Sequence, residues 1–250
     1  MKRLVVVADD FGLSSGVVEG IVEAHENGIV TSTSLMVNAP AAEAAFAAAR
    51  RLPALATGLH FVLTCGRPAG PPAPLERLLE ADGTFRRNGS GAHELARPDE
   101  VRDELRAQLQ AFEIGVGRPP THIDGHHHVH LHPGILRVAI EEAGRLGIPL
   151  RSTGPEVRKR LRIERIRTCD RFLDDFYGDD VSEARLISIL ESIAEGTSEL
   201  MCHPAQRDSD LGRISSYVAP RHQELRVLCS EKIRGAVDRI GIDLVPTSRV

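Results

Sequence analysis

LVVVADDFG, residues 4–12, is a valine-rich apolar run that ends in two adjacent carboxylates, Asp9 and Asp10. A short continuous apolar run of this kind is typical of a parallel strand covered on both faces. The carboxyl end of a buried first strand is where α/β folds place their chemistry, and two adjacent acids repel each other unless a cation or a shared proton relieves them. The run therefore predicts a buried strand with a candidate site at its end. The alternative is a plain turn in which Ser14 or Ser15 caps the next helix.

Downstream of this strand, the apolar periodicity alternates between helices and further strands. Strands are predicted at residues 31–38, 56–63, 121–125, 148–152, 199–202 and 243–246, and helices at residues 17–27, 41–51, 97–112, 135–146, 181–195 and 230–240. About seven strands that alternate with helices, without a long linker, predict an α/β fold: a single-domain (β/α) barrel, distorted or incomplete. A doubly wound open sheet is the main alternative. No GxGxxG follows the first strand and no GxxxxGKS/T occurs, so dinucleotide and P-loop sites have no support.

The periodicity fails between residues 64 and 96, where Pro and Gly are frequent and Asp82-Gly83 and Asn88-Gly89 are turn signals. Loops at the mouth of such a fold carry substrate contacts. We therefore predict one domain over residues 1–250, with a loop insertion at about residues 64–96 over one mouth of the barrel.

THIDGHHHVHLHP, residues 121–133, holds six of the eleven histidines of the chain. Imidazole is partly polar and has an ordinary pKa of about 6.5, so six together make a poor packing surface. Extended backbone would place Asp124 and His126 on one face, whereas helical backbone would stack His126 on His130. The run is internal and interrupted by apolar residues, which argues against a tag or a surface tract without function. It predicts a metal or catalytic site.

Two further histidines lie at the carboxyl ends of predicted strands, His60 in GLHF and His203 after ELMC. A lone histidine in an apolar strand is usually a hydrogen-bonded core residue. In a barrel, however, the strand ends converge at one mouth, which would bring both histidines together with Asp9, Asp10 and His126. A carboxylate with two imidazoles suits Zn²⁺ and other divalent ions, and leaves positions open for water and substrate. A bound ion of this kind lowers the pKa of water and polarises a carbonyl, which indicates hydrolysis.

Charge and composition exclude several classes of protein. The net charge is −4, from 31 basic and 35 acidic residues, and no basic stripe occurs, which argues against nucleic acid as a partner. No run of about 18 apolar residues could span a membrane, and the short apolar segment after Met1-Lys2-Arg3 does not resemble a signal peptide. The four cysteines form no CxxC pair, which suits reduced thiols. These features predict a cytoplasmic protein.

Five motifs in the same order carry a resemblance to a known family. They are ADDFGLS at 8–14, VTSTSLMVNAP at 30–40, GLHFVLT at 58–64, PTHIDGHHHVHLHP at 120–133 and ELMCHPA at 199–205. Together they resemble the YdjC-type carbohydrate deacetylases, which include the chitooligosaccharide deacetylases and a hopanoid-biosynthesis-associated branch. The resemblance implies a distorted (β/α) barrel, one divalent metal ion, a homodimer and removal of acetyl from a short N-acetylated oligosaccharide or glycoconjugate.

The resemblance also implies roles for individual residues. Asp10, His60 and His126 would be the metal ligands, and Asp9 would be the general base by similarity to the more distant NodB-type deacetylases. His203 would be the general acid for the departing amine. Oxygen and nitrogen ligands suit Mg²⁺ or Zn²⁺, with Mn²⁺ and Co²⁺ as further candidates.

Several points stay open from the sequence. Asp124 is expected to orient a ligand histidine, as metal-bound imidazoles generally require, whereas His128 and His130 could contact metal or substrate, or merely pack. The same ligands would serve a hydrolase of another amide, ester or phosphoester, or a metal-binding protein without turnover. Aromatic residues are scarce, so platforms for a sugar ring must be few; the candidates near predicted loops are Phe85, Phe176, Tyr177 and Tyr217.

Overall fold

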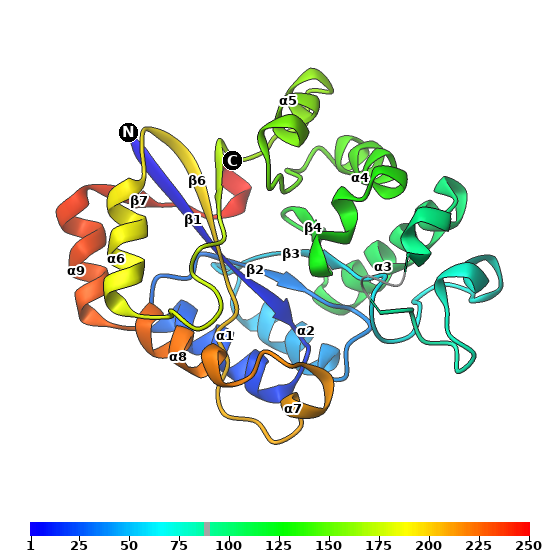
Figure 1. Cartoon of the computed structure of the whole chain (residues 1–250), viewed down its shortest axis with the longest axis horizontal. Helices are drawn as coiled ribbons and strands as arrows, with labels where there is room; N and C mark the ends of the chain where they lie inside the picture. The colour runs from blue at the N-terminus through cyan, green and yellow to red at the C-terminus, as the bar shows by residue number, and fades with distance from the viewer. Residues whose placement is uncertain (88–90) are drawn as a thin grey trace.

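A curled parallel sheet of seven strands forms a half-barrel flanked by helices in the computed structural model, which describes residues 1–87 and 91–250 (Figure 1). The strands are β1 (Lys2–Phe11), β2 (Ser32–Leu35), β3 (Ala56–Phe61), β4 (Ile123–Gly125), β5 (Arg171–Leu173), β6 (Gly196–Cys202) and β7 (Ile242–Leu244). Their order is β4-β3-β2-β1-β6-β5, and β7 pairs with β1. The predicted fold class, an incomplete single-domain barrel of about seven strands, is confirmed.

The helices form an outer layer around the sheet. They are α1 (Ser15–Glu26), α2 (Ala42–Arg51), α3 (Pro98–Val116), α4 (Pro133–Leu146), α5 (Pro155–Ile163), α6 (Glu183–Ser192), α7 (Leu211–Ile214), α8 (Ala219–Leu228) and α9 (Glu231–Ile240). Among the described residues there are also four short 3₁₀ helices: η1 (Ala73–Leu78), η2 (Ala92–Leu95), η3 (His126–Leu131) and η4 (Thr247–Arg249). Helix α8 packs on α1, and α2, α3 and α4 follow in turn around the outside, while α6 packs on α9 (Figure 1).

Strand β1 is the centre of the sheet because its apolar residues are covered on both faces. Its run from Leu4 to Ala8 is fully buried. The strand pairs with β6 from Lys2 to Ala8, with β7 over its first residues, and with β2 from Val7 to Phe11. The carboxyl end of β1 therefore lies between β2 and β6, in the interior of the curled sheet.

Several elements differ from the prediction, and helix α8, which carries Arg221 and Glu224, was not predicted. Residues 148–152 form only an isolated bridge, between Ile123 and Leu150, and β5 was not predicted. Strand β5 has three residues, Arg171 is exposed, and β6 is its one partner, so its sequence lacks a strand-like apolar pattern. Helix α5 lies in a basic stretch whose charges hide its single buried residue, Leu161.

Between β3 and α3 the described residues form the two 3₁₀ helices η1 and η2 and a bridge from Leu79 to Phe85. Leu75, Leu78 and Phe85 are buried against the main core. The turn predicted at Asp82-Gly83 is present, with Gly83 at φ 79°. Asn88-Gly89 lies outside the described residues. That residues 64–96 are an insertion in one domain stays a prediction.

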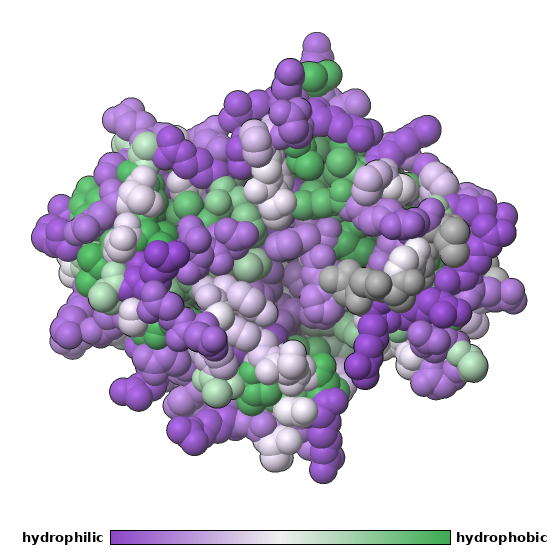
Figure 2. All heavy atoms as spheres, in the orientation of Figure 1, coloured by the Kyte–Doolittle hydropathy of each residue, from purple (hydrophilic) through white to green (hydrophobic). Residues whose placement is uncertain are grey.

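The surface seen in Figure 2 is mostly hydrophilic, and its hydrophobic atoms form separate patches. Among the described residues, no helix combines the length and the apolar composition needed to cross a membrane. All four cysteines are free thiols. The cytoplasmic location and the homodimer stay predictions.

Candidate active site

The carboxyl end of β1 carries both Asp9 and Asp10 into the interior of the sheet. In a regular strand these neighbours would point to opposite faces. The pairing of β1 with β2 shifts register between Ala8 and Phe11, and Asp10 has a left-handed backbone with φ 67°. Such an irregularity re-aims side chains and is frequent beside active sites. As a result, each of the two carboxylates reaches His60, which lies near the carboxyl end of β3.

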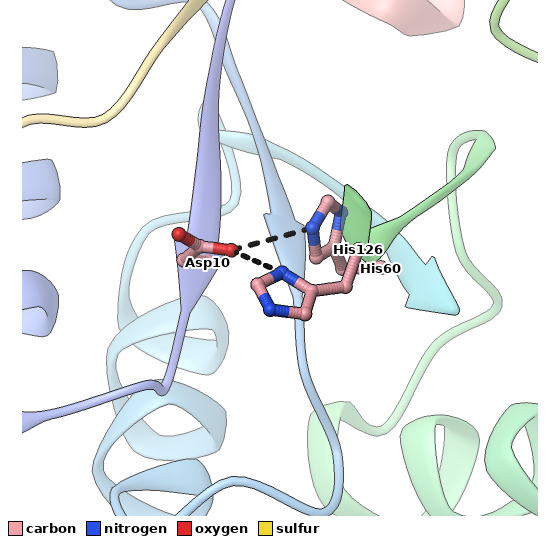
Figure 3. A group of neighbouring side chains, drawn as sticks. All are labelled: Asp10, His60 and His126. Atoms are coloured by element: carbon pink, nitrogen blue, oxygen red, sulfur yellow. Dashed lines mark hydrogen bonds and ion pairs between the residues drawn. The ribbon is translucent and has the colours of Figure 1, made fainter. Parts of the chain in front are cut away.

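Asp10, His60 and His126 form a compact group of one oxygen and two nitrogen donors. Asp10 Oδ1 lies 2.9 Å from His126 Nδ1 and 3.4 Å from His60 Nε2. Figure 3 shows the Asp10 carboxylate, near the end of β1, facing the two imidazole rings. The three donor atoms lie within 4.8 Å of one another. This donor set fits a divalent metal ion, as the sequence predicted.

Asp124 fixes the orientation of His60. Its Oδ1 lies 2.7 Å from His60 Nδ1, and Ser34 Oγ donates to its other oxygen at 2.6 Å. Because His60 Nδ1 is engaged by a carboxylate, Nε2 is left to face Asp10. Burial would lower the pKa of His60, but the negative charge of Asp124 and the bond to Asp10 raise it to about 10. The site thus favours a positive charge here, which a cation can supply in place of a proton.

Asp9 is held by a buried guanidinium rather than by a histidine. Arg151 donates to Asp9 Oδ2 at 2.6 Å and to Asp9 Oδ1 at 2.8 Å. The same guanidinium contacts Asp124 at 2.9 Å and Glu199 at 2.5 Å. A second group that could hold a metal, formed by Asp9, His60 and Asp124, is therefore already neutralised by Arg151. The group around Asp10 is the better metal site.

Helix α8 reaches the site with two side chains that lie about one turn apart. Arg221 donates to Asp10 Oδ2 at 2.6 Å, so Asp10 presents only its other oxygen to the histidines. Burial would raise the pKa of Asp10, but the positive charge of Arg221 and the contacts with His126 and His60 hold it well below its ordinary value. Glu224 is fully buried and accepts a bond from the backbone N–H of His203.

His203 follows β6 and lies against Glu224 and two tyrosines. Its Nδ1 is 4.0 Å from Glu224 Oε1 and has no hydrogen-bond partner among the described residues. Burial, together with the charge of Arg221, lowers the pKa of His203 to about 4. Burial raises the pKa of Glu224 to about 7. The ring of His203 is 5.3 Å from that of Tyr177 and 5.8 Å from that of Tyr217.

The remaining histidines of the 121–133 run have other neighbours. His130 is buried, and its Nε2 lies 3.2 Å from the backbone oxygen of Arg151, so it packs beneath the site. His127 and His128 are left-handed, with φ near 53° and 55°, and they interrupt η3. His127 Nδ1 is 3.2 Å from Thr64 Oγ1, and the ring of His128 packs edge-on against Phe172. Among the described residues, His126 does not stack on His130 in a helix, and the run supplies no second ligand to the group of Asp10, His60 and His126.

Sequence reasoning found the acids and histidines of the site but not the groups that hold them. Arg151, Arg221 and Glu224 lie outside the five motifs, and Glu199 opens the ELMCHPA motif without being recognised as a partner of Arg151. A single sequence gives no signal that pairs the two arginines with Asp9 and Asp10, or Glu224 with His203. The prediction that Asp124 orients a histidine agrees with its contact to His60.

Comparisons with known proteins agree with the predicted resemblance. The family model described as YdjC-like protein matches residues 3–239. A carbohydrate deacetylase of Geobacillus stearothermophilus is 44% identical over 245 residues, which cover 98% of this chain and 96% of that protein. A chitooligosaccharide deacetylase of Salmonella paratyphi B is 40% identical over 251 residues, 96% of each chain.

A solved structure has the same fold. It is a protein of Enterococcus faecalis described as a candidate cellobiose-phosphate cleavage protein, and it superposes with a TM-score of 0.93 at 34% identity, covering 99% of this chain and 98% of its own. The family model, the two relatives and the solved structure each match nearly the whole length of this chain. The chain therefore belongs to the family of YdjC-like proteins.

Proposed function

We propose that this chain is a metal-dependent carbohydrate deacetylase that releases acetate from N-acetylated sugars. The observation that carries the proposal is the convergence of Asp10, His60 and His126, with Asp9 and His203 beside them, at the carboxyl ends of β1, β3, β4 and β6. The relatives named as carbohydrate and chitooligosaccharide deacetylases supply the substrate class.

Asp10, His60 and His126 would hold the metal ion through Oδ1, Nε2 and Nδ1. When bound there, a divalent ion supplies Lewis acidity, which polarises a carbonyl and acidifies water. Mg²⁺ and Zn²⁺ are the first candidates and Mn²⁺ and Co²⁺ the next, because mixed oxygen and nitrogen donors accept all four. Arg221 keeps Asp10 ionised and leaves one of its oxygens free for this role.

Asp9 is the proposed general base. It would accept the proton of the water that attacks the amide carbon, while Arg151 holds both of its oxygens in place. The attack forms a C–O bond, and the C–N bond then breaks to give acetate and an amine.

His203 is the proposed general acid, which would give a proton to the departing nitrogen. With its pKa lowered to about 4, His203 is neutral on its own near pH 7. Glu224, whose pKa is raised to about 7, lies beside it. The 4.0 Å between Nδ1 and Oε1 is longer than a hydrogen bond. We expect the two groups to come within reach of each other in the substrate complex, so that the proton of Glu224 passes through His203 to the amine.

Acetate release from a panel of substrates tests the function. The panel contains N-acetylglucosamine and its β-1,4-linked oligomers, an N-acetylated amino acid, an acetylated sugar ester and sugar phosphates. We expect acetate from the N-acetylated sugars only. Phosphate release from the sugar phosphates would favour a phosphoesterase, and acetate only from the amino acid or the ester would favour another amidase or esterase. Stoichiometric metal binding without any turnover would favour a binding protein.

A further inference from the structure

Two tyrosine rings are stacked beside His203, outside the group of acids and histidines. The rings of Tyr177 and Tyr217 lie 4.2 Å apart with an angle of 16° between their planes. Tyr177 comes from the loop between β5 and α6, and Tyr217 from the segment between α7 and α8. Both rings contact His203 edge-on. The stack thus borders the proposed general acid.

Tyr217 is fixed from several sides. Its hydroxyl donates to Glu224 Oε1 at 2.7 Å and accepts from the backbone N–H of Gly178 at 3.1 Å. Arg221 donates to its backbone oxygen at 2.8 Å, and the guanidinium lies 5.5 Å from the ring centre. The ring is therefore held by the same helix that orients Asp10 and His203, and it provides a rigid base for Tyr177.

Tyr177 is the most exposed aromatic side chain of the protein, at 48%. None of the residues outside the described ranges is aromatic. The phenylalanines Phe85 and Phe176, which the sequence suggested as platforms, are buried in the core, so that expectation is wrong for both. The residues that flank these two phenylalanines are polar, but both rings pack in the main hydrophobic core. Phe172 is partly buried against Arg151 and His128.

We propose that the open face of Tyr177 binds a second sugar ring of the substrate, next to the ring that loses its acetyl group. Its other face is covered by Tyr217, and His203 lies beside both rings at similar distances of 5.3 Å and 5.8 Å. When the acetylated nitrogen of one sugar ring lies at His203, that sugar ring lies to the side of the two tyrosines. The sugar ring linked to it can then cover the open face of Tyr177. The apolar face of a pyranose suits a flat aromatic surface. This inference rests on the proposed function and assigns recognition of the second sugar ring to Tyr177.

Tyrosine fluorescence measures this binding directly. The chain has two Tyr and no Trp, so its intrinsic tyrosine emission arises wholly from the stack. The metal-loaded Asp9→Asn variant is titrated with N-acetylglucosamine, its β-1,4-linked dimer and N-acetylglycine. We expect a saturable change in emission with the dimer at a Kd about tenfold below that of the monosaccharide, and none with N-acetylglycine. Equal Kd values for dimer and monosaccharide, or no change at dimer concentrations that saturate acetate release by the wild type, would overturn the proposal.

Substitution of Tyr177 separates the platform from the chemistry. Tyr177→Ala should raise KM for the dimer about tenfold and change kcat little, with a smaller effect on the monosaccharide, whereas Tyr177→Phe keeps the ring and should restore the KM for the dimer. Ile163→Ala, at an exposed position on α5, is the control for surface truncation. If the wild type releases acetate and Tyr177→Ala has an unchanged KM for the dimer, the platform is wrong and the deacetylase stands. If the wild type releases acetate from no sugar, the proposed function itself fails.

Discussion

Asp9 and Asp10 are neighbours in the chain, but each is paired with a different arginine. Asp9 is bound by Arg151 through both oxygens, whereas Asp10 gives one oxygen to Arg221 and turns the other to His60 and His126. The left-handed backbone at Asp10 makes this division feasible. Conformations of this kind cost about 1–3 kcal/mol and persist where the surroundings hold them, as at functional sites. Asp10 is therefore suited to binding a metal ion, and Asp9 to accepting a proton.

Asp9→Asn tests the role of the base. Asparagine has nearly the same shape but cannot accept the proton, and Arg151 keeps its contacts with Asp124 and Glu199. We expect metal content equal to that of the wild type and kcat lower by about 10²- to 10⁴-fold. Metal content and steady-state rates on the same preparation check this. Retained turnover with full metal content would assign the base to another group.

Glu224→Gln tests the passage of a proton from Glu224 through His203. In the wild type, Glu224 loses its proton as the pH rises through about 7, so the rate should fall above that pH. The glutamine variant can still accept from the backbone N–H of His203 but does not titrate, so this fall should disappear. A pH–rate profile for each protein makes the comparison. The same alkaline limb in both would remove Glu224 from the proton pathway.

The sequence predicted which motif residues come together, but not the partners that come from far along the chain. The motif residues Asp10, His60 and His126 meet as the barrel prediction requires. Arg151 lies 142 residues from Asp9, and Arg221 lies 211 residues from Asp10. The chain has 31 basic residues, and only the folded structure shows that these two are buried against the acids of the site.

At the scale of elements, close packing of α1 against the segment after β6 places His203. A methyl group on Gly20 of α1 would lie 2.5 Å from Cα of Ala205 and 2.7 Å from the backbone N of Gln206. Backbone atoms cannot rotate away as a flexible side chain can. The approach of these two segments therefore depends on a residue without a side chain.

Gly20→Ala should push α1 away from residues 203–206. Overpacking of this kind costs about 1–3 kcal/mol, which exceeds the gain of about 0.5–1 kcal/mol for alanine over glycine in a helix. We expect lower stability in denaturant titration and lower kcat through displacement of His203. The matched control is Gly235→Ala on α9, where an added methyl group meets nothing within 4 Å. That variant should be more stable than the wild type by about 0.5–1 kcal/mol. Equal effects at both positions would contradict the packing argument.

Elements with a clear apolar pattern were predictable, whereas elements without one were not, among them the ten-residue helix α8, whose buried face includes Arg221 and Glu224. Strand β1 has ten residues and a continuous apolar run, which fixed its place in a parallel sheet. Strand β5 has three residues and takes its place from pairing with β6, a contact that its own sequence does not encode. The register shift that turns Asp10 toward the histidines likewise arises from pairing with β2.

For the whole molecule, buried histidines link stability to pH. Burial lowers the pKa of His130 from 6.5 to about 3. The unfolded chain takes up a proton at this residue as the pH falls through about 6.5, whereas the folded chain does so only near 3. The stabilisation from neutral His130 is thus complete above pH 6.5 and is lost as the pH falls toward 3.

His130→Gln isolates this contribution, because glutamine does not titrate and can still donate to the backbone oxygen of Arg151. We expect the free energy of unfolding of the wild type, relative to the variant, to fall by about 3 kcal/mol between pH 7 and pH 4. Urea titrations of both proteins at the two pH values measure it. A difference that does not change with pH would mean that His130 titrates normally in the folded chain.

The central claim is that Asp10, His60 and His126 hold a divalent ion on which deacetylation depends. The most direct measurement is acetate release from the β-1,4-linked dimer of N-acetylglucosamine by metal-stripped protein, with Mg²⁺, Zn²⁺, Mn²⁺ and Co²⁺ added back singly and Asp10→Ala measured alongside. We predict no release without metal, recovery with at least one ion, and neither metal binding nor release in Asp10→Ala. Full release by the stripped protein, or tight metal binding and turnover in Asp10→Ala, would contradict the claim.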